Sequence, residues 1–225
     1  MENPWLNLEK TDGKYIAECD RGHLTPDLMN DLAVDTLPWP YMGDHEKATV
    51  YVLTTSTKAN HAREAADGKG RQEVIEKNLA HKHGNDCFPL IALDPRFNGT
   101  GLQNWWMDRL SNLIRFPPSM EDVAHSIFIA QYVPYSHHRN RLSRLPSQEY
   151  TFSLVRKAMK GGKIIVLMYP YNEWCEAIPE LETYSYFCAL RYIGVPISNG
   201  NIIGKVGFDD IVKAIRKAEG KGESG

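Results

Sequence analysis

The sequence lacks the features of a membrane or secreted protein. No uninterrupted apolar run reaches the roughly 18 residues that a membrane-spanning helix needs. The N-terminal stretch MENPWLNLEK is polar and acidic, unlike a signal peptide. Internal repeats and linker-like segments are also missing. We therefore expect one cytoplasmic domain over residues 1–219 without membrane contact, followed by a disordered tail at 220–225.

Cysteine is scarce, and its spacing excludes the usual structural uses of the residue. The chain has four cysteines, at positions Cys19, Cys87, Cys175 and Cys188. They are far apart and form no CxxC pair, so we expect reduced thiols rather than a disulfide framework or a zinc ribbon. His81, His83 and Cys87 lie close in sequence, but a metal site needs three or four converging ligands. We expect no metal and no cofactor.

No charge of one sign dominates the chain. Its 26 Lys and Arg against 28 Asp and Glu leave a net charge of -2, which provides no global attraction to nucleic acid or to an anionic membrane. A polyanionic partner would have to be held by a local basic patch. The most basic loop carries His137, His138, Arg139, Arg141 and Arg144. It is either a phosphate contact or a surface loop that acidic neighbours neutralise.

Short apolar runs alternate with helical patterns along the chain. The runs predict strands at Ala48–Leu53, Ser126–Val133, Lys163–Met168 and Tyr192–Ile197. Helices are expected at 25–34 with Thr25 as cap, at 60–83 in two pieces, at 103–116, from a Ser147 cap to Gly161, at 171–181, and after Gly207. This alternation predicts an α/β protein, a three-layer α/β/α sandwich with a mainly parallel four-stranded central sheet.

The chain turns abruptly from apolar to polar after the first predicted strand. Thr54, Thr55, Ser56 and Thr57 lead into a helix-forming run that begins near Asn60. In an open α/β sheet, ligands bind at the carboxyl ends of the strands, so these hydroxyl groups are candidates for a site. The alternative is that they only form a turn and cap the following helix.

A series of motifs follows in order from residue 3 to residue 201: NPW, LPWPYMGD, FPLIALDP followed by two tryptophans, IFIAQYVPYSH, LPSQEY, KIIVLM and ISNGN. Together they resemble the uracil-DNA glycosylase superfamily, especially a bacterial branch with an NPW start and an LPxPYxGD approach to the first strand. The resemblance implies the glycosylase fold, a nucleobase pocket at the strand ends, and DNA or another nucleobase-containing ligand as the partner.

The resemblance implies a role for Ser56, where this sequence departs from the family. Cleavage of an N-glycosidic bond needs a group that activates or positions water and donors for the departing base. The superfamily carries Asp or Asn just after the first strand, in a motif that ends in Pro-Gly. Here Ser56 stands at that position, followed by Thr57 and Lys58. A serine hydroxyl orients water but is a poor base unless another group activates it.

Two further family positions also differ. Gln131 stands where relatives carry an Asn that reads the base edge, and Phe88 is the candidate stacking aromatic. The family's His-Pro-Ser-Pro loop reads VPISNGN here, so its histidine is missing. Asp44 and Asp94 could replace the missing base, although both lie in turn contexts where Asp usually bonds its own backbone.

These comparisons give a set of candidate site residues. The catalytic candidates are Ser56, Thr55 and Ser198; the base-binding candidates are Phe88, Gln131 and Thr54; the nucleic-acid contacts are Lys58, Asn60, Arg139, Arg141, Asn199 and Asn201. Three functions remain open. The chain is a DNA glycosylase-like hydrolase with altered catalytic residues, an inactive nucleic-acid- or nucleotide-binding module of the same fold, or a protein that binds a free nucleoside or another small molecule.

Overall fold

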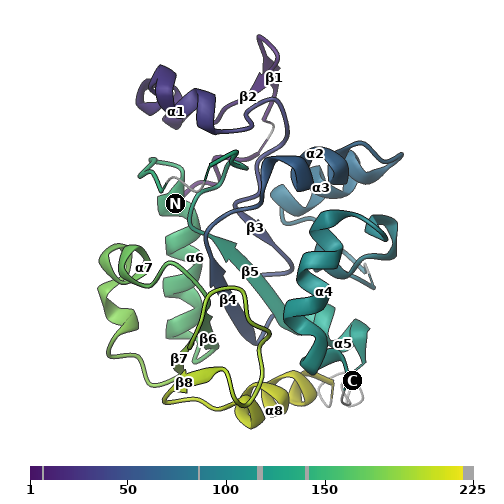
Figure 1. Ribbon diagram of the computed structural model, residues 1–225, viewed down its shortest axis with the longest axis vertical. Coiled ribbons are helices and arrows are strands. Elements are labelled where there is room, and N and C mark those ends of the chain that lie inside the picture. The colour runs from purple at the N-terminus through teal and green to yellow at the C-terminus, as the bar shows by residue number, and fades with distance from the viewer. Residues whose placement is uncertain (7, 86, 116–118, 140–141, 220–225) are drawn as a thin grey trace.

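One mixed sheet organises the chain (Figure 1). The computed structural model describes residues 1–6, 8–85, 87–115, 119–139 and 142–219. Within these residues, six strands form a largely parallel sheet in the order β3-β5-β4-β6-β7-β8. The strands are β3 (Tyr41–Met42), β4 (Val50–Thr54), β5 (Ile127–Gln131), β6 (Ile164–Leu167), β7 (Phe187–Leu190) and β8 (Ile202–Gly204). A separate hairpin pairs β1 (Lys10–Thr11) with β2 (Lys14–Tyr15).

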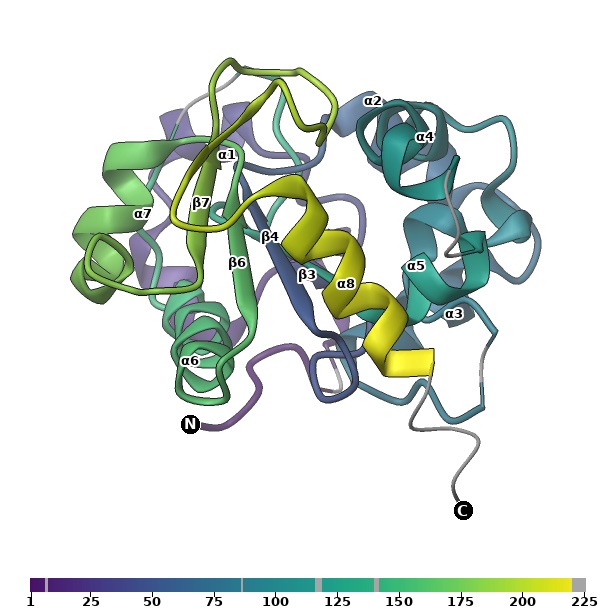
Figure 2. The same ribbon diagram turned by 90° about the horizontal axis from the view of Figure 1, so that it is seen from below.

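Helices flank this sheet. They are α1 (Pro26–Asp31), α2 (Ala59–Ala66), α3 (Arg71–Leu79), α4 (Gly101–Ile114), α5 (Met120–Ser126), α6 (Gln148–Lys160), α7 (Tyr171–Ala177) and α8 (Phe208–Glu219). Short 3₁₀ helices span Glu18–His23, Ile91–Leu93, Pro95–Phe97 and Pro179–Leu181. Figure 2 shows α6 and α7 to one side of the sheet and α4 and α5 to the other, with α8 beside α5. No helix in the described ranges is both long and apolar enough to cross a bilayer.

The centre of the sheet matches the expected class. β4 pairs in parallel with β5 on one side and with β6 on the other, and β7 continues the parallel order. Every residue of β4 and β5 is buried, as expected for strands covered by helices on both faces. The predicted α/β fold with a mainly parallel sheet is confirmed. The predicted tail at 220–225 lies outside the described residues, and the single domain over 1–219 stays a prediction.

The predicted strand count and the position of the fourth strand were wrong. The sheet has two antiparallel edge strands in addition, β3 and β8, which are too short to show a hydrophobic period. The fourth parallel strand is Phe187–Leu190, and the predicted segment 192–197 is a loop. Gly194 adopts a φ of 75° there, and Pro196 has no N–H for a ladder. Ile193 in this loop is 69% exposed.

The helix predictions were mostly confirmed at their N-termini. The Thr25 hydroxyl accepts a hydrogen bond from the Leu28 N–H at 3.3 Å and caps α1. The predicted break near Gly68 and Gly70 separates α2 from α3. Ser147 precedes α6, but its side chain makes no capping bond. Instead its backbone N–H donates to Asp20 at 2.9 Å.

A group of buried tyrosine and half-buried histidine rings lies beside β3. His81 stacks on Tyr41 with ring centroids 4.5 Å apart, and its Nε2 is 2.9 Å from the Tyr150 hydroxyl. The His45 ring packs edge-on against His81 at 4.4 Å. Burial, with the nearby charges of His45 and His83, lowers the pKa of His81 to about 3. Burial also lowers the pKa of His45. Both imidazoles are therefore neutral at pH 7.

These histidines predict a loss of stability on acidification. In the unfolded chain His81 regains its ordinary pKa near 6.5 and takes up a proton that the folded protein excludes. The free energy of unfolding should therefore fall as pH drops from about 6.5 towards 3, by up to about 1.4 kcal/mol per pH unit from His81 alone. Urea unfolding at pH 7, 6 and 5 measures this slope.

The matched variant is His81→Asn, since asparagine tolerates the φ of 54° at this position. It should be less stable than wild type at pH 7, because Tyr150 loses its partner, but its stability should depend less on pH. An unchanged slope in the variant would contradict the role given to His81.

Candidate functional site

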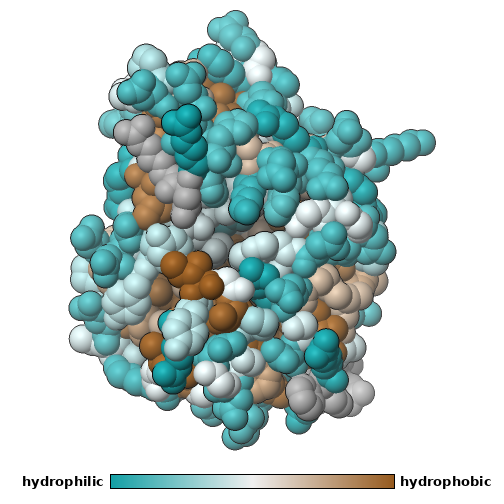
Figure 3. All heavy atoms as spheres, viewed as in Figure 1, coloured by the Kyte–Doolittle hydropathy of each residue, from teal (hydrophilic) through white to brown (hydrophobic). Residues whose placement is uncertain are grey.

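A cavity of about 270 Å³ opens at the carboxyl ends of β4 and β5. Its lining residues come from five separate parts of the chain: Thr54, Thr55, Ser56, Thr57, Lys58, His61, Leu102, Trp105, Trp106, Gln131, His137, Tyr169 and Ile193. The space-filling view shows a hollow in this face of the molecule, with hydrophobic side chains at its edge (Figure 3). This is the edge of the sheet at which parallel strands place ligand sites.

Backbone hydrogen bonds continue between the two segments after β4 and β5 end. The N–H groups of Tyr132 and Val133 donate to the carbonyls of Thr54 and Thr55, each at 2.8 Å. Further along, the His137 N–H donates to the Thr57 carbonyl at 3.2 Å, and the Ala59 N–H donates to the His137 carbonyl at 2.9 Å. These bonds hold the turn after β4 against the loop after β5, so side chains about 80 positions apart in sequence meet in one cavity.

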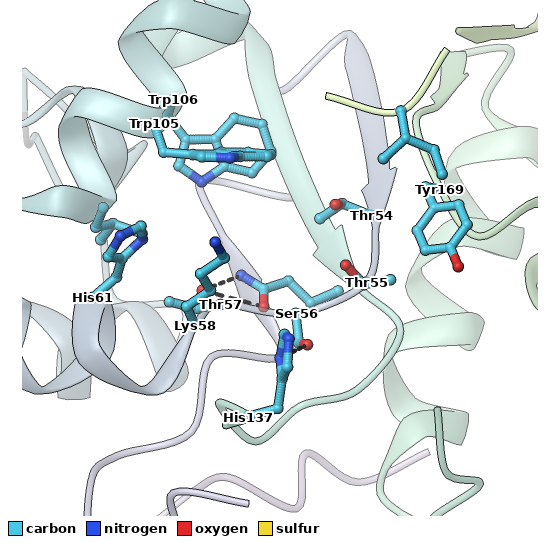
Figure 4. A pocket seen from close by; sticks show the side chains of 13 residues that line it. Thr54, Thr55, Ser56, Thr57, Lys58, His61, Trp105, Trp106, His137 and Tyr169 are labelled. Atoms are coloured by element: carbon cyan, nitrogen blue, oxygen red, sulfur yellow. Dashed lines mark hydrogen bonds between the residues drawn. The ribbon is translucent and has the colours of Figure 1, made fainter. Parts of the chain in front are cut away.

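Ser56 and His137 form the closest polar contact in this arrangement. Ser56 Oγ lies 2.5 Å from His137 Nδ1 (Figure 4). Burial lowers the pKa of His137, and the carboxylate of Asp31 partly offsets this effect. His137 is therefore neutral at pH 7. With its hydrogen on Nε2, it accepts the Ser56 hydroxyl hydrogen at Nδ1. This is the activating partner that a serine needs to act as a base or a nucleophile.

The Gln131 amide is held by Thr57. Gln131 Nε2 donates to Thr57 Oγ1 at 2.8 Å, and the Thr57 hydroxyl lies 3.3 Å from Gln131 Oε1. Both side chains are buried, and Gln131 is 1% exposed. An amide has two donor hydrogens and two acceptor sites, so Gln131 retains hydrogen-bonding capacity for a ligand. The hydrogen bond with Thr57 fixes the orientation of the Gln131 amide, and with it the direction of the remaining donor and acceptor sites.

Aromatic rings from α4 wall the cavity opposite the polar turn (Figure 4). Trp105 and Trp106 meet edge to face, with ring centroids 4.6 Å apart. The guanidinium of Arg109 lies 4.5 Å from the Trp105 ring centroid, which fixes that ring further. Tyr169, just after β6, lies across the cavity from the tryptophans. Such rings bind flat, aromatic groups by stacking.

The electrostatics of the cavity favour an anionic ligand or a developing negative charge. Lys58 lines it, and no carboxylate does among the residues that the structure describes. Burial and the charge of Lys58 both lower the pKa of His61, so this imidazole is also neutral at pH 7. In the described part of the chain, no group of three or more His, Cys, Asp or Glu side chains is placed to hold a metal ion. The usable groups are therefore hydroxyls, imidazoles, one amide and one ammonium.

Five predicted site residues meet in this cavity: Thr54, Thr55, Ser56, Lys58 and Gln131. Other predicted residues lie elsewhere. Phe88 packs against the hydrophobic core, and Asn60 is exposed on the first turn of α2. Arg139 is exposed, with its Nε 4.0 Å from Asp31, which agrees with neutralisation by an acidic neighbour. Arg141 lies outside the described residues.

The residues predicted in the 198–201 loop form a separate site. Ser198 and Asn199 line a second cavity with Phe208, Lys213 and Arg216 from α8. Asn201 bonds within its own loop, because its Nδ2 donates to the Pro196 carbonyl at 3.0 Å. None of the three is among the described residues that line the Ser56 cavity. A direct role beside Ser56 is therefore not supported by this arrangement.

The two aspartates considered as replacement bases have structural roles. Asp44 accepts hydrogen bonds from the N–H groups of Glu46 and Lys47 at 2.9 and 3.2 Å. Asp94 accepts the Arg96 N–H at 2.8 Å and also binds the Arg96 side chain. Both carboxylates bond nearby backbone, as their turn contexts predicted.

Eight residues that line the cavity were not among the predicted site residues: Thr57, His61, Leu102, Trp105, Trp106, His137, Tyr169 and Ile193. His137 was predicted as part of a basic loop that contacts phosphate or is neutralised by acidic neighbours, and not as a partner of Ser56. The need of Ser56 for an activating base could have indicated this partner. Trp105 and Trp106 were assigned to a helix, and a pair of adjacent tryptophans cannot both face the core on one helix stripe. His61 follows the polar turn by one helical turn, which places it near the same strand end.

The contact between Thr57 and Gln131 predicts a measurable coupling. Thr57→Val removes the hydroxyl and leaves a buried amide without this partner, so the free energy of unfolding should fall by about 1–3 kcal/mol. Adding Gln131→Leu removes the unpaired amide, and the double variant should lose less than the sum of the two single variants. Urea unfolding of the four proteins measures the coupling, and strictly additive losses would contradict it.

We found no match to this chain among models of protein families, curated proteins or solved structures. The chemistry of the cavity is therefore the basis on which a function can be assigned.

Proposed function

We propose that this protein is a uracil-DNA glycosylase-like hydrolase that cleaves the N-glycosidic bond of a base in DNA or in a related ligand. The observation that carries the proposal is the 2.5 Å contact between Ser56 Oγ and His137 Nδ1 inside a cavity walled by tryptophans. The three-layer α/β/α glycosylase arrangement is part of the proposal. A largely parallel sheet flanked by helices agrees with it.

Each requirement of the reaction has a candidate group in the cavity. A flipped base needs an aromatic wall, which Trp105 and Trp106 supply in place of the expected Phe88. Gln131 offers its remaining hydrogen-bonding sites to the base edge. Ser56 and His137 position a water molecule and accept its proton. Lys58 is the cation that stabilises the negative charge on the departing base.

A second function is favoured by a specific observation. Glycosidic cleavage builds positive charge on the sugar, and the described residues that line the cavity include no carboxylate to stabilise it. A module that binds a nucleobase without turnover needs only the aromatic wall, the amide and the cation. Such a module would bind the same ligands but release no base.

A base-release assay separates these functions. Single- and double-stranded oligonucleotides carrying uracil, hypoxanthine or bulky modified pyrimidines are incubated with the protein at low and moderate salt. The wild type should release one of these bases, and Ser56→Ala and His137→Gln should each slow release by about 100-fold or more. Gln131→Ala should change which base is preferred. The measurement is free base detected by chromatography.

The control is Ser153→Ala, because the Ser153 hydroxyl donates to the Tyr150 carbonyl within α6. It should release base at the wild-type rate. Equal rates in all variants would overturn the roles given to Ser56 and His137. Saturable binding without release supports the binding module, and no oligonucleotide binding at low salt points to a free nucleoside or another small molecule.

A further inference from the structure

Ser56 stands at a strand–turn–helix junction. β4 ends at Thr54 and α2 begins at Ala59, so Ser56 lies in the short turn between them and faces the cavity. A turn of this kind presents a hydroxyl group at the top of a sheet, where substrate can reach it. Nucleophilic serines of α/β hydrolases occupy such turns for this reason.

The partner of Ser56 is placed to accept its proton. His137 is 8% exposed and is held on both sides by backbone bonds. Its N–H donates to Thr57, and its carbonyl accepts from Ala59. These bonds fix the backbone of His137, and the burial of its side chain restricts the imidazole to the position beside Ser56. A fixed base within hydrogen-bond reach of a serine is the geometric signature of nucleophilic catalysis.

The buried carboxylate of Asp31 lies near this imidazole and acts on it through its charge. Asp31 is 6% exposed and neighbours His137 through the adjacent backbone, because the Asp31 carbonyl accepts the His138 N–H at 2.7 Å. Leu32 and His137 also form a β-bridge. The negative charge of Asp31 stabilises the imidazolium that forms when His137 takes a proton. Ser56 and His137 thus supply a hydroxyl and a base in contact, and Asp31 adds a nearby negative charge.

We infer that Ser56 is a nucleophile that takes an acyl group from small carboxylic esters, with His137 as its general base. This activity goes beyond glycosidic hydrolysis and does not depend on it. The cavity of about 270 Å³ admits a small ester, and the aromatic rings of Trp105 and Trp106 favour an aryl group. The absence of a lining carboxylate among the described residues and the presence of Lys58 favour neutral or anionic esters over cationic ones.

The reaction runs in two balanced steps. Ser56 Oγ bonds to the ester carbonyl carbon while its proton passes to His137 Nδ1, and Lys58 lies in the same cavity as the developing oxyanion. The bond to the alcohol oxygen then breaks, and His137 returns the proton to that oxygen. Water attacks the acyl-serine, His137 accepts the water proton, and Ser56 Oγ recovers it as the carboxylic acid leaves.

The test uses the whole protein with two probes, an alkyl fluorophosphonate and p-nitrophenyl acetate. The fluorophosphonate should add one label per chain, located on Ser56 by mass spectrometry of the peptides. The ester should give a burst of p-nitrophenolate close to one equivalent, followed by slower turnover. Ser56→Ala should lose both the label and the burst. His137→Gln should slow labelling by about 100-fold or more.

Ser153→Ala is again the matched control, because its hydroxyl is bonded within α6. In this variant, Ser56 should be labelled at the wild-type rate and to the wild-type extent. The labelling rate should be constant at neutral pH and fall on acidification, as His137 takes up a proton. A purely structural role for His137 would leave that pH profile unchanged in His137→Gln. An unlabelled wild type, or a label that persists in Ser56→Ala, would overturn the inference.

The outcome is distinguishable from that of the glycosylase proposal. Base release without acylation rejects Ser56 as an acyl acceptor and leaves glycosidic hydrolysis standing. Acylation without base release supports Ser56 as an acyl acceptor and rejects glycosidic hydrolysis. Circular dichroism of each variant verifies that the fold is intact, so that a lost label reports chemistry and not unfolding.

Discussion

The parallel pairing of β4 with β5 is the constraint on which the candidate site depends. The two strands are in register from Val50 against Ile127 to Thr54 against Gln131, and backbone bonds continue beyond both strand ends to His137. A shift of this register by one residue would turn every side chain of the strand to the opposite face. Both strands are buried on both faces, so such a shift would place side chains of the wrong size in close-packed positions on each face. The core therefore also sets the distance between Ser56 and His137.

The loop after β5 is fixed from its outer side as well. The Ala33 N–H donates to the Ser136 carbonyl, and the Trp39 N–H donates to the Pro134 carbonyl. Tyr135 reaches the N-terminal segment, where its hydroxyl donates to the fully buried carboxylate of Asp20 at 2.8 Å. The loop thus lies between two layers of backbone. Catalytic groups act efficiently when the structure holds them in place before substrate arrives.

The cavity combines groups that differ from those expected under the proposed glycosylase function. In the uracil-DNA glycosylase superfamily, an Asp or Asn after the first strand activates or positions water. A histidine lies in the loop after the fourth strand. Here the hydroxyl of Ser56 takes the first place, and the imidazole comes from the loop after the second parallel strand, β5. Both imidazoles in the cavity are neutral at pH 7 because they are buried and near Lys58. A neutral imidazole is the form that accepts a proton, so the site is suited to base or nucleophile chemistry.

The sequence predicts the class of the fold and five of the thirteen residues that line the cavity. Continuous apolar runs identify strands such as β4 and β6, because residues buried on both faces must all be apolar. It also placed Ser56 and Gln131 at strand ends, since the change from apolar to polar is local. The edge strands β3 and β8 were not predicted, because two or three residues carry no measurable period. The strand β7 was predicted too late in the chain, at 192–197, because apolar residues also occur in the loop that follows it. Which of these side chains meet in the cavity depends on the tertiary fold. The contact of Ser56 with His137, and the position of Trp105 across from both, follow from strand register and helix packing, which join residues that no local pattern connects.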